Sequence, residues 1–269
     1  MHSCMPVAVV TGANRGLGLE TAKSLAQRGY RVWLTGRDAS SIAQATASLQ
    51  AQGLDVQSAL LDVADPTTIR EFSERMAAEP EISALVNNAG VNNAGASLQG
   101  FDAKLAATTL DNNYRGAVRV TDALWSRLAP DARIVMVSSG MGELSSFSPE
   151  LRLRLLATTL NRAQIEEIAE EFVSAVARGS HARAGFPSNA YSVSKALLNA
   201  FTRVLAQQLA SSARRVNAVC PGWVKTRMGG DSAPRTVEQG ASGIVWAATL
   251  RESSAENGGF FRDAKAIAW

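Results

Sequence analysis

The sequence predicts an α/β protein built on a doubly wound, mostly parallel sheet, and three observations carry this prediction. Short apolar segments rich in β-branched residues alternate with longer segments that have the apolar spacing of helices. A glycine-rich turn joins the first strand to the first helix. No apolar run approaches the roughly 20 residues of a membrane helix. Strands separated by helices pair in parallel through right-handed crossovers, so helices are expected on both faces of the sheet.

The alternation places the elements one after another along the chain. Strands are expected at residues 7–11, 31–35, 56–61, 84–87, 133–138 and 215–220, where the runs are almost wholly apolar, as in strands buried on both faces. Helices are expected at residues 17–28, 39–52, 67–78, 112–128, 191–212 and 236–250. The complete sheet is expected to contain seven parallel strands.

One long segment, at about residues 143–187, precedes the helix expected at Tyr191. It greatly exceeds the connection of about two to six residues that is usual in such folds. Asn161 and Gln164 have the spacing of a helix capping box. They are followed by one apolar stripe of helical spacing, formed by Ile165, Ile168, Phe172, Val173 and Val176. We therefore expect a helical insertion that packs on the body, and a single domain over residues 1–269.

Composition and charge exclude several classes of function. The 269 residues are 46% hydrophobic and 19% charged, which suffices for a substantial core. The net charge of +3 is scattered through the helices, and no basic run interleaves with aromatic residues, so nucleic-acid binding is not expected. The start of the chain has no basic leader or cleavage site, and no His, Cys or carboxylate spacing suits a metal. We expect no membrane partner and no metal.

Other polar residues are expected to be structural. Cys4 and Cys220 permit at most one disulfide, and an apolar strand precedes Cys220, so a buried thiol in a reducing cytoplasm is expected. His181 lies in a polar segment with no partner nearby in sequence and is expected at the surface rather than as a catalytic base. A solvated face of the insertion helix is expected for Glu166, Glu167, Glu170 and Glu171.

The turn after the first strand has the composition of a phosphate-binding loop. In TGANRGLG, glycines stand at Gly12, Gly16 and Gly18, between a strand and a helix. Glycines there permit a tight turn, let the backbone approach a pyrophosphate and leave amides at the positive end of the helix. The loop predicts a dinucleotide site that also includes Asn14, Arg15 and Leu17.

The end of the second strand favours NADPH over NADH. Gly36 stands where an acid would hold the ribose 2′-hydroxyl of NADH, and Arg37 follows it. Together with Arg15, this guanidinium is suited to a 2′-phosphate. Two alternatives stay open, namely that both arginines are plain surface residues and that Asp38 contacts the ribose. After the third strand, Asp62 and the Val63 amide are expected to bind adenine, unless Asp62 serves only the turn.

The segment VNNAGVNNAG repeats five residues. The first copy follows a strand, so Asn87 is expected to brace neighbouring strands, while Ala89 and Gly90 leave room for a ribose at the sheet edge that binds ligands. No strand precedes the second copy, residues 92–95, which we interpret as a polar loop over the site or a chance duplication.

A tyrosine and a lysine stand four residues apart in YSVSK, hence on one helix face. An ammonium near the phenol of Tyr191 would lower its pKa, and reaching neutrality requires roughly 4 kcal/mol at about 1.4 kcal/mol per unit. Lys195 can supply part of this. Ser138 and Ser139 end the fifth strand on the same sheet edge, and Ser139 is the better candidate to hold a carbonyl oxygen because Ser138 still belongs to the strand.

Six motifs in order, TGANRGLG, NNAG, NxxG, VSSG, YSVSK and PGWVKT, make the whole chain resemble the short-chain dehydrogenase/reductase superfamily. The long insertion and the stretches SPEL, FPSNAYSVSK and CPGWVKT resemble its monomeric carbonyl-reductase branch. The resemblance implies a Rossmann fold, NADPH or NADP⁺ as cofactor and a monomer, because the insertion would cover the helices that pair in oligomeric relatives.

The resemblance also implies roles for individual residues. Tyr191 would be the general acid, Ser139 would polarise the carbonyl, and Lys195 would lower the pKa of Tyr191 and hold the nicotinamide ribose. Asn113 would support a proton-relay water; Asn112 stands beside it, but the NYRG spacing selects Asn113. The carboxamide of the nicotinamide would be held by Pro221, Gly222, Val224 and Thr226.

The sequence therefore predicts an NADPH-dependent reductase of an aldehyde or ketone, a small-molecule carbonyl substrate. Met141, Trp223 and Met228 lie next to the expected site loops and are candidates for the substrate pocket, with core packing as the alternative. A catalytically silent NADP(H)-binding sensor or scaffold is the second hypothesis, opposed by the intact Asn, Ser, Tyr and Lys set. Sugar-nucleotide epimerases are a third, opposed by the short chain after Thr226.

Overall fold

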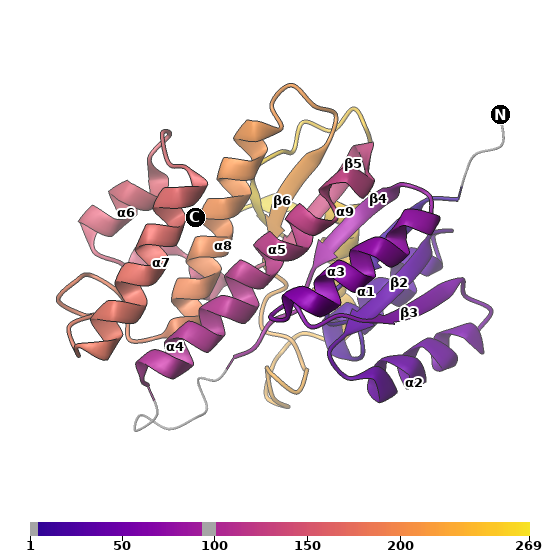
Figure 1. Cartoon of the computed structure of the whole chain (residues 1–269), viewed down its shortest axis with the longest axis horizontal. Helices are drawn as coiled ribbons and strands as arrows, with labels where there is room; N and C mark the ends of the chain where they lie inside the picture. Colours follow the sequence, from indigo (N-terminus) through magenta and orange to yellow (C-terminus); the bar gives the residue numbers. More distant parts are fainter. Residues whose placement is uncertain (1–4, 93–100) are drawn as a thin grey trace.

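One mixed sheet forms the centre of the computed structural model, which describes residues 5–92 and 101–269. Its strand order is β3-β2-β1-β4-β5-β6-β7-β8 (Figure 1). The strands are β1 (Val7–Val10), β2 (Arg31–Gly36), β3 (Val56–Leu60), β4 (Ile82–Asn87), β5 (Leu128–Val137), β6 (Arg215–Val219), β7 (Phe260–Arg262) and β8 (Lys265–Ala266). All neighbouring pairs from β3 to β7 are parallel, and β8 is antiparallel to β7. The doubly wound order places the chain reversal between β1 and β4, where such sheets bind ligands.

Helices cover both faces of the sheet, as the sequence predicts. One face is packed by α1 (Gly16–Ala26), α2 (Ala39–Gln50) and α9 (Val237–Ala248). The other is packed by α3 (Pro66–Arg75), α4 (Ala103–Leu110), α5 (Gly116–Ala123) and α8 (Ala190–Gln208). Strand residues alternate between the two cores: Val7 and Val9 join the second layer, and Ala8 and Val10 join the first. This alternation follows from the two-residue period of a strand.

The predicted insertion contains α6 (Pro149–Leu156) and α7 (Arg162–Ala177). The capping box is confirmed: the Asn161 side chain accepts from the Gln164 amide, and the Gln164 side chain accepts from the Asn161 amide, both at 3.0 Å. The apolar stripe is buried except for Val173, which is half-buried against the core. It packs α7 against α4 and α8, beside the helix that carries Tyr191 (Figure 1).

The elements differ from the prediction in two details. The sheet has an eighth strand beyond the seven predicted, because Asp263 and Ala264 take positive φ angles of 52° and 58° and turn the chain back in a two-residue hairpin. The helix predicted at 112–128 begins at Ala103, where Asp102 caps it by accepting from the Leu105 amide at 2.7 Å. Its middle is one π-helical turn, η2 (Asp111–Arg115), and its regular part ends at Ala123.

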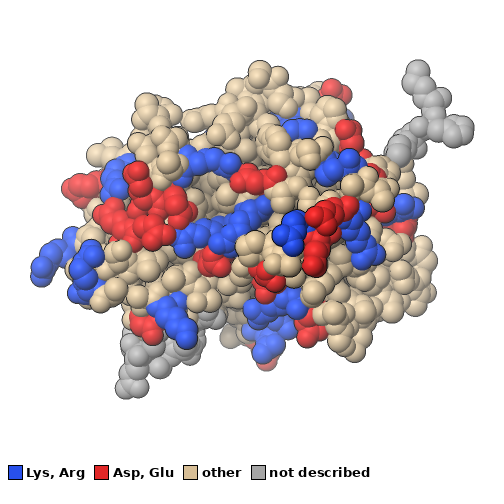
Figure 2. All heavy atoms as spheres, viewed as in Figure 1, with Lys and Arg blue, Asp and Glu red and all other residues tan. Residues whose placement is uncertain are grey.

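The solvated face that the sequence predicts for α7 also carries ion pairs. Figure 2 shows acidic side chains gathered over α7 with basic side chains beside them. Three of the four glutamates make ion pairs: Glu166 and Glu170 with Arg115, and Glu171 with Arg154 at 2.8 Å. Among the four, Glu167 alone has no ion pair in the described structure. The three paired glutamate side chains are still 39% to 64% exposed, so the predicted solvated face is confirmed, and the ion pairs with Arg115 and Arg154 add to it.

His181 is partly exposed, as expected for a surface residue, and it contacts two other residues. Its Nε2 lies 2.8 Å from the Ser188 hydroxyl, and its ring meets Phe101 edge-on at 5.1 Å between centroids. Cys220 is a buried free thiol, as expected, whereas Cys4 lies outside the described residues. No helix in the described part of the chain has the length and apolarity needed to span a membrane. Nor do those residues hold three or more His, Cys, Asp or Glu side chains arranged to bind a metal.

Candidate active site

The glycine loop between β1 and α1 has the backbone that its sequence predicts. Gly12 and Gly16 have φ angles of 63° and 56°, the left-handed region that favours glycine. A Cβ on Gly18 would lie 2.5 Å from both the Asn88 side-chain nitrogen and the Gly12 carbonyl oxygen. The residue before α1, Arg15, provides no side-chain cap, so the first amides of α1 are left for a ligand. Such a helix start binds phosphate.

Asn88 fixes this loop, a role that the sequence analysis assigned to no residue. Its side-chain nitrogen donates to the Thr11 carbonyl at 2.8 Å and to the Gly12 carbonyl at 3.1 Å. The Thr11 hydroxyl in turn accepts from the amides of Asn88 and Ala89, each at 2.9 Å. The first NNAG copy thus joins β4 to the glycine loop. The sequence signal for this role was the position of Asn88, the second asparagine of that copy, in a loop expected to approach the nucleotide.

Asn87 lies at the end of β4 but braces a helix as well as a strand. Its side-chain nitrogen donates to the Thr121 hydroxyl on α5 at 3.0 Å and lies 3.4 Å from the sulfur of Met136 on β5. Its side-chain oxygen is buried without a hydrogen-bond partner in the described structure. Most of the second NNAG copy, residues 93–95, lies outside the described residues.

Two cations are candidates for a 2′-phosphate site: Arg37 directly after β2 and Arg15 directly before α1. Arg15 and Arg37 are exposed, and neither makes an ion pair with another described residue. Asp38 is instead the N-cap of α2 and accepts from the Ser41 amide at 2.6 Å, which lowers the pKa of its carboxyl. The side chain of Asn14 reaches the Ser41 hydroxyl at 3.1 Å and so ties the glycine loop to α2. Two free guanidiniums and an acid occupied by capping suit a 2′-phosphate better than a bare ribose.

The loop after β3 leaves one carboxylate oxygen available. Asp62 accepts from the Ala64 amide at 3.0 Å, so it does serve the turn, but its other oxygen bonds no described residue. Val63 is buried against the start of α5, where a Cβ on Gly116 would lie 2.8 Å from a Val63 methyl. The predicted adenine contacts and the turn alternative are therefore compatible.

Asn113, rather than Asn112, points inward from the π-helical turn. Asn113 is 1% exposed, its side-chain oxygen accepts from the Val91 amide at 2.7 Å, and its nitrogen donates to the Val91 carbonyl at 2.8 Å. The same nitrogen donates to the Ser194 hydroxyl on α8 at 3.0 Å. Asn112 only donates to the Thr108 carbonyl of its own helix. π-helical turns are frequent at functional sites because the extra residue redirects a side chain.

Ser139 and Tyr191 meet across the end of β5. The Ser139 hydroxyl hydrogen-bonds Tyr191, and it accepts from the Met141 amide at 3.2 Å at the start of η4 (Gly140–Gly142). Ser138 is 2% exposed, and its hydroxyl has no partner in the described structure. Of the two serines, only Ser139 is placed beside the phenol. Tyr191 itself lies in the first turn of α8, which Asn189 caps by accepting from the Ser192 amide at 3.0 Å.

Lys195 completes the cluster from the next turn of α8. Its ammonium donates to the Val137 carbonyl at 2.7 Å and lies 5.6 Å from the centroid of the Tyr191 ring. A Cβ on Gly90 would lie 3.2 Å from the Asn113 side-chain oxygen and 3.6 Å from the Lys195 ammonium. The first NNAG copy, Asn113 and Lys195 are thus neighbours, as their predicted roles require.

Burial dominates the pKa values of the pair. Burial raises the pKa of Tyr191 to about 12, although the hydrogen bond from Ser139 opposes it. Burial lowers the pKa of Lys195 to about 8, so the side chain stays mostly charged at neutral pH but loses its charge at moderately alkaline pH. The net pKa of Tyr191 is thus raised although the Lys195 ammonium lies near its ring, so the lowering of this pKa by Lys195 stays a prediction.

The loop after β6 lies against both the glycine loop and the serine turn. A Cβ on Gly16 would lie 3.4 Å from a Thr226 methyl, which places the predicted carboxamide-binding residues beside the nucleotide loop. Thr226 accepts from the Gly229 amide at 3.1 Å, and Val224 is buried. Pro221 and Gly222 follow Cys220, whose sulfur accepts from the Gly140 amide at 3.1 Å. All four predicted positions therefore belong to one loop beside the site.

The three candidate pocket residues are exposed, so the core-packing alternative is wrong. Met141 is 46% exposed, Trp223 is 56% exposed and Met228 is 49% exposed. Trp223 is fixed by its indole nitrogen, which donates to the Gly229 carbonyl at 2.8 Å. Large apolar side chains next to a polar cluster provide a surface for the apolar part of a substrate.

A doubly wound sheet with an uncapped glycine-loop helix and a Tyr–Lys pair at its ligand-binding edge defines a dinucleotide-dependent oxidoreductase. The chain belongs to the short-chain dehydrogenase/reductase family. The model described as short chain dehydrogenase matches residues 6–149, and the model described as Enoyl-(Acyl carrier protein) reductase matches residues 155–252.

The chain is also similar to individual reductases of this family. The chain is 36% identical to carbonyl reductase [NADPH] 3 of Rattus norvegicus and 33% identical to carbonyl reductase [NADPH] 1 of Homo sapiens, in each case over 100% of both chains. Among solved structures it is similar to salutaridine reductase from Papaver somniferum, with a TM-score of 0.86 and 32% identity over 96% of this chain and 99% of that one.

Proposed function

We propose that this chain reduces an aldehyde or ketone to the alcohol with NADPH, in the manner of a carbonyl reductase. The observation that carries the proposal is the meeting of Ser139, Tyr191, Lys195 and Asn113 at one edge of the sheet, next to the uncapped start of α1. The two carbonyl reductases [NADPH] named above match this chain over their full length. This chain has all four of the polar residues just named.

The residues present fit a bound dinucleotide. The free amides of α1 and its glycines would hold the pyrophosphate, and Arg15 with Arg37 would hold the 2′-phosphate. Asp62 and the Val63 amide would contact adenine, and Ala89 with Gly90 would leave room for the ribose. Loop residues Pro221, Gly222, Val224 and Thr226 would orient the nicotinamide ring. The bound NADPH supplies the hydride, and the residues of this chain supply the proton and the geometry.

Tyr191 is the proton donor in this proposal. Its raised pKa keeps the phenol protonated at neutral pH, and the Ser139 hydroxyl beside it would donate a hydrogen bond to the substrate carbonyl oxygen and so orient it. As negative charge develops on that oxygen, the proton on Tyr191 moves to it, and the Lys195 charge nearby stabilises the phenolate left behind. Asn113 holds the backbone at Val91 and would support the water that returns a proton to the site.

Several finer expectations belong to the same proposal. We expect the chain to act as one domain and as a monomer, since α7 covers α4 and α8, helices on which a partner would otherwise pack. The free buried thiol of Cys220 supports a reducing compartment such as the cytoplasm. The exposed apolar rim of Met141, Trp223 and Met228 supports a carbonyl compound with an apolar body. The sensor or scaffold hypothesis stays weaker because no member of the polar set is missing.

The test follows NADPH absorbance with aromatic aldehydes, quinones, α-dicarbonyls and cyclic ketones. Wild-type protein is expected to oxidise NADPH in the presence of some of these, and Tyr191→Phe is expected to lower the rate by about 10²- to 10⁴-fold, the range for a general acid. Tyr30→Phe, at the opposite end of the sheet, is the matched control and should keep the rate. Tight NADPH binding by wild-type protein without turnover would favour the sensor hypothesis. Turnover that survives in Tyr191→Phe would refute the role of Tyr191.

A further inference from the structure

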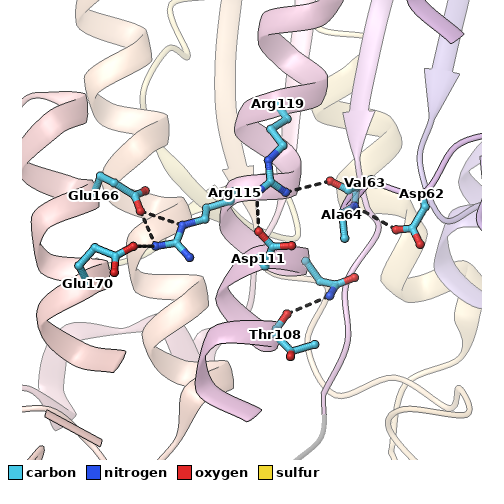
Figure 3. Close-up of polar contacts among 10 residues, drawn as sticks. Asp62, Val63, Ala64, Thr108, Asp111, Arg115, Arg119, Glu166 and Glu170 are labelled. Atoms are coloured by element: carbon cyan, nitrogen blue, oxygen red, sulfur yellow. Dashed lines mark hydrogen bonds and ion pairs between the residues drawn. The ribbon is translucent and has the colours of Figure 1, made fainter. Parts of the chain in front are cut away.

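The π-helical turn that carries Asn113 is held from outside by the insertion. Arg115 stands two residues after Asn113 in the chain, and Figure 3 shows its guanidinium reaching Glu166 and Glu170. Its Nε donates to a Glu166 oxygen at 2.8 Å, and one of its terminal nitrogens contacts both carboxylates. The guanidinium side chain is 19% exposed, less than either carboxylate. This two-carboxylate bridge joins a segment of the site to a helix some 50 residues away in sequence.

The electrostatics of the bridge favour a fixed guanidinium. Burial lowers the pKa of Arg115, but the hydrogen bond and the charges of Glu166, Glu170 and Asp111 outweigh it and raise that pKa overall. Glu166 and Glu170 are four residues apart and so share one face of α7, where two like charges would repel without the cation between them. An isolated exposed ion pair contributes little to stability. A partly buried guanidinium that contacts two carboxylates also fixes the orientation of the arginine side chain.

On its inner side, the π-helical turn is linked by hydrogen bonds to the residues proposed for catalysis. Asn113 bonds both backbone groups of Val91 and donates to the Ser194 hydroxyl. That hydroxyl donates to the Tyr191 carbonyl at 2.7 Å. A shift of the π-helical turn would therefore move both the Asn113 amide and its link to the first turn of α8. A π-helical turn inside an α-helix is rare and is retained where local contacts favour it over the regular helix.

We infer that Arg115 is a positioning residue for the reaction, and that α7, through Glu166 and Glu170, keeps the π-helical turn in the conformation that aims Asn113 at the site. The inference rests on the proposed function only for its effect on turnover. Its structural part, the hold on Asn113, stands independently.

A second ion pair on α7 offers a matched control. Arg154 on α6 pairs with Glu171 at 2.8 Å, so its loss also removes an ion pair of the insertion, but it does not touch the π-helical turn. Arg115→Met keeps the length of the side chain and removes its charge and donors. The double variant Glu166→Gln with Glu170→Gln removes the carboxylates, and the triple variant completes a thermodynamic cycle.

The experiment combines two readouts. For turnover, kcat of Arg115→Met is expected to fall about ten-fold and its pH profile to change, within the roughly 100-fold that a 1 Å misplacement can cost. The KM for NADPH should change less than about two-fold, and Arg115→Lys should recover part of kcat. The triple variant should be no slower than Arg115→Met, because the partners act as one unit. Arg154→Met should keep both kcat and the pH profile.

The second readout needs no turnover. The Val91 amide donates to the Asn113 side chain, so its hydrogen exchange reports whether Asn113 stays in place. Exchange at Val91 is expected to be about ten-fold faster in Arg115→Met than in wild-type or Arg154→Met protein. An unchanged Val91 amide would overturn the inference, as would equal losses of kcat in Arg115→Met and Arg154→Met. Wild-type protein inactive toward every carbonyl would refute the proposed function while the Val91 exchange still decides the role of Arg115.

Discussion

The nucleotide end of the site and the insertion end are held together in different ways. Around the glycine loop, the fixing contacts are short hydrogen bonds from neutral groups, such as those from Asn88 to the Thr11 and Gly12 carbonyls. Around α7, an apolar stripe is supplemented by ion pairs with partly exposed carboxylates, and Glu170 is 64% exposed. Salt screens such pairs but has little effect on the neutral bonds. The glycine loop is therefore fixed by neutral hydrogen bonds, whereas the π-helical turn that carries Asn113 is held by charged contacts with α7.

Lys195 stands where the two ends meet, and its loss is expected to have the largest effect. In Lys195→Met, kcat should fall about 10²- to 10⁴-fold, because the charge that stabilises the phenolate of Tyr191 is gone. The pH profile of wild-type protein should lose activity as pH rises through about 8, the pKa of Lys195. Steady-state kinetics between pH 6 and 10 measure both effects. A lysine variant with wild-type kcat would show that this residue only packs.

The same lysine gives a stability prediction with a definite sign. Its folded pKa of about 8 lies below the ordinary 10.5, so between these values the unfolded chain binds more protons and stability rises with pH. The cost of the buried charge at pH 7 is about 3 kcal/mol, at about 1.4 kcal/mol per unit. Urea unfolding should show this rise between pH 8 and 10 in wild-type protein and not in Lys195→Met. A parallel rise in both proteins would assign it to other groups.

Two helical glycines, Gly18 and Gly243, differ in how closely an added Cβ would approach its neighbours. Gly18→Ala should destabilise the fold by about 1 to 3 kcal/mol and raise the KM for NADPH, because its Cβ would lie 2.5 Å from Asn88 and from the Gly12 carbonyl. Gly243→Ala, on α9, places its Cβ 3.4 Å from Val219 and should be neutral or stabilise by up to about 1 kcal/mol. Urea unfolding and KM for both variants decide. Equal, small effects on stability and KM would mean that the glycine loop accommodates a Cβ at residue 18 by a small shift.

The contrast between the two ends also explains what the sequence could predict. The glycine loop, the Tyr191 and Lys195 pair and the capping box at Asn161 are local patterns, and each follows from spacing within a few residues. The Arg115 bridge joins residues about 50 positions apart, and nothing in either segment indicates the partner. The π-helical turn could not be predicted either, because the sequence NNYRG is compatible with an ordinary α-helix. Only the fold shows Asn113 hydrogen-bonded to Val91. The eighth strand was missed because β8 has only two residues.

The net pKa of Tyr191 is a property that the sequence pattern could not give. The sequence places Lys195 on the right helix face, but only the fold shows that its ammonium donates to the Val137 carbonyl. Burial, which sequence spacing does not report, then sets the pKa of both groups.

Two arginines sharpen the comparison at the nucleotide end, where charge rather than geometry is predicted to select the cofactor. Arg15→Met and Arg37→Met should each raise the KM for NADPH about ten-fold, near the 1.4 kcal/mol expected for a charge-assisted contact, and change the KM for NADH less than about two-fold. Added salt should raise the KM for NADPH in wild-type protein and less so in the variants. Arg28→Met, an exposed change beyond α1, controls for net charge. Equal changes for both cofactors would place the arginines away from the 2′-phosphate.

The smallest effects come from two capping boxes that differ in where they stand. Asn161→Ala at the start of α7 and Thr236→Ala at the start of α9 should each cost about 1 kcal/mol of stability, since each removes the side chain that accepts from an N3 amide. The first turns of α9 also touch the site: a Cβ on Gly240 would lie 2.6 Å from Val224 and 2.8 Å from Leu17. Thr236→Ala should therefore also raise the KM for NADPH, whereas Asn161→Ala should leave it unchanged. If both variants lose stability and neither changes KM, the start of α9 does not shape the nucleotide site, and the glycine loop with Asn88 is sufficient to form it.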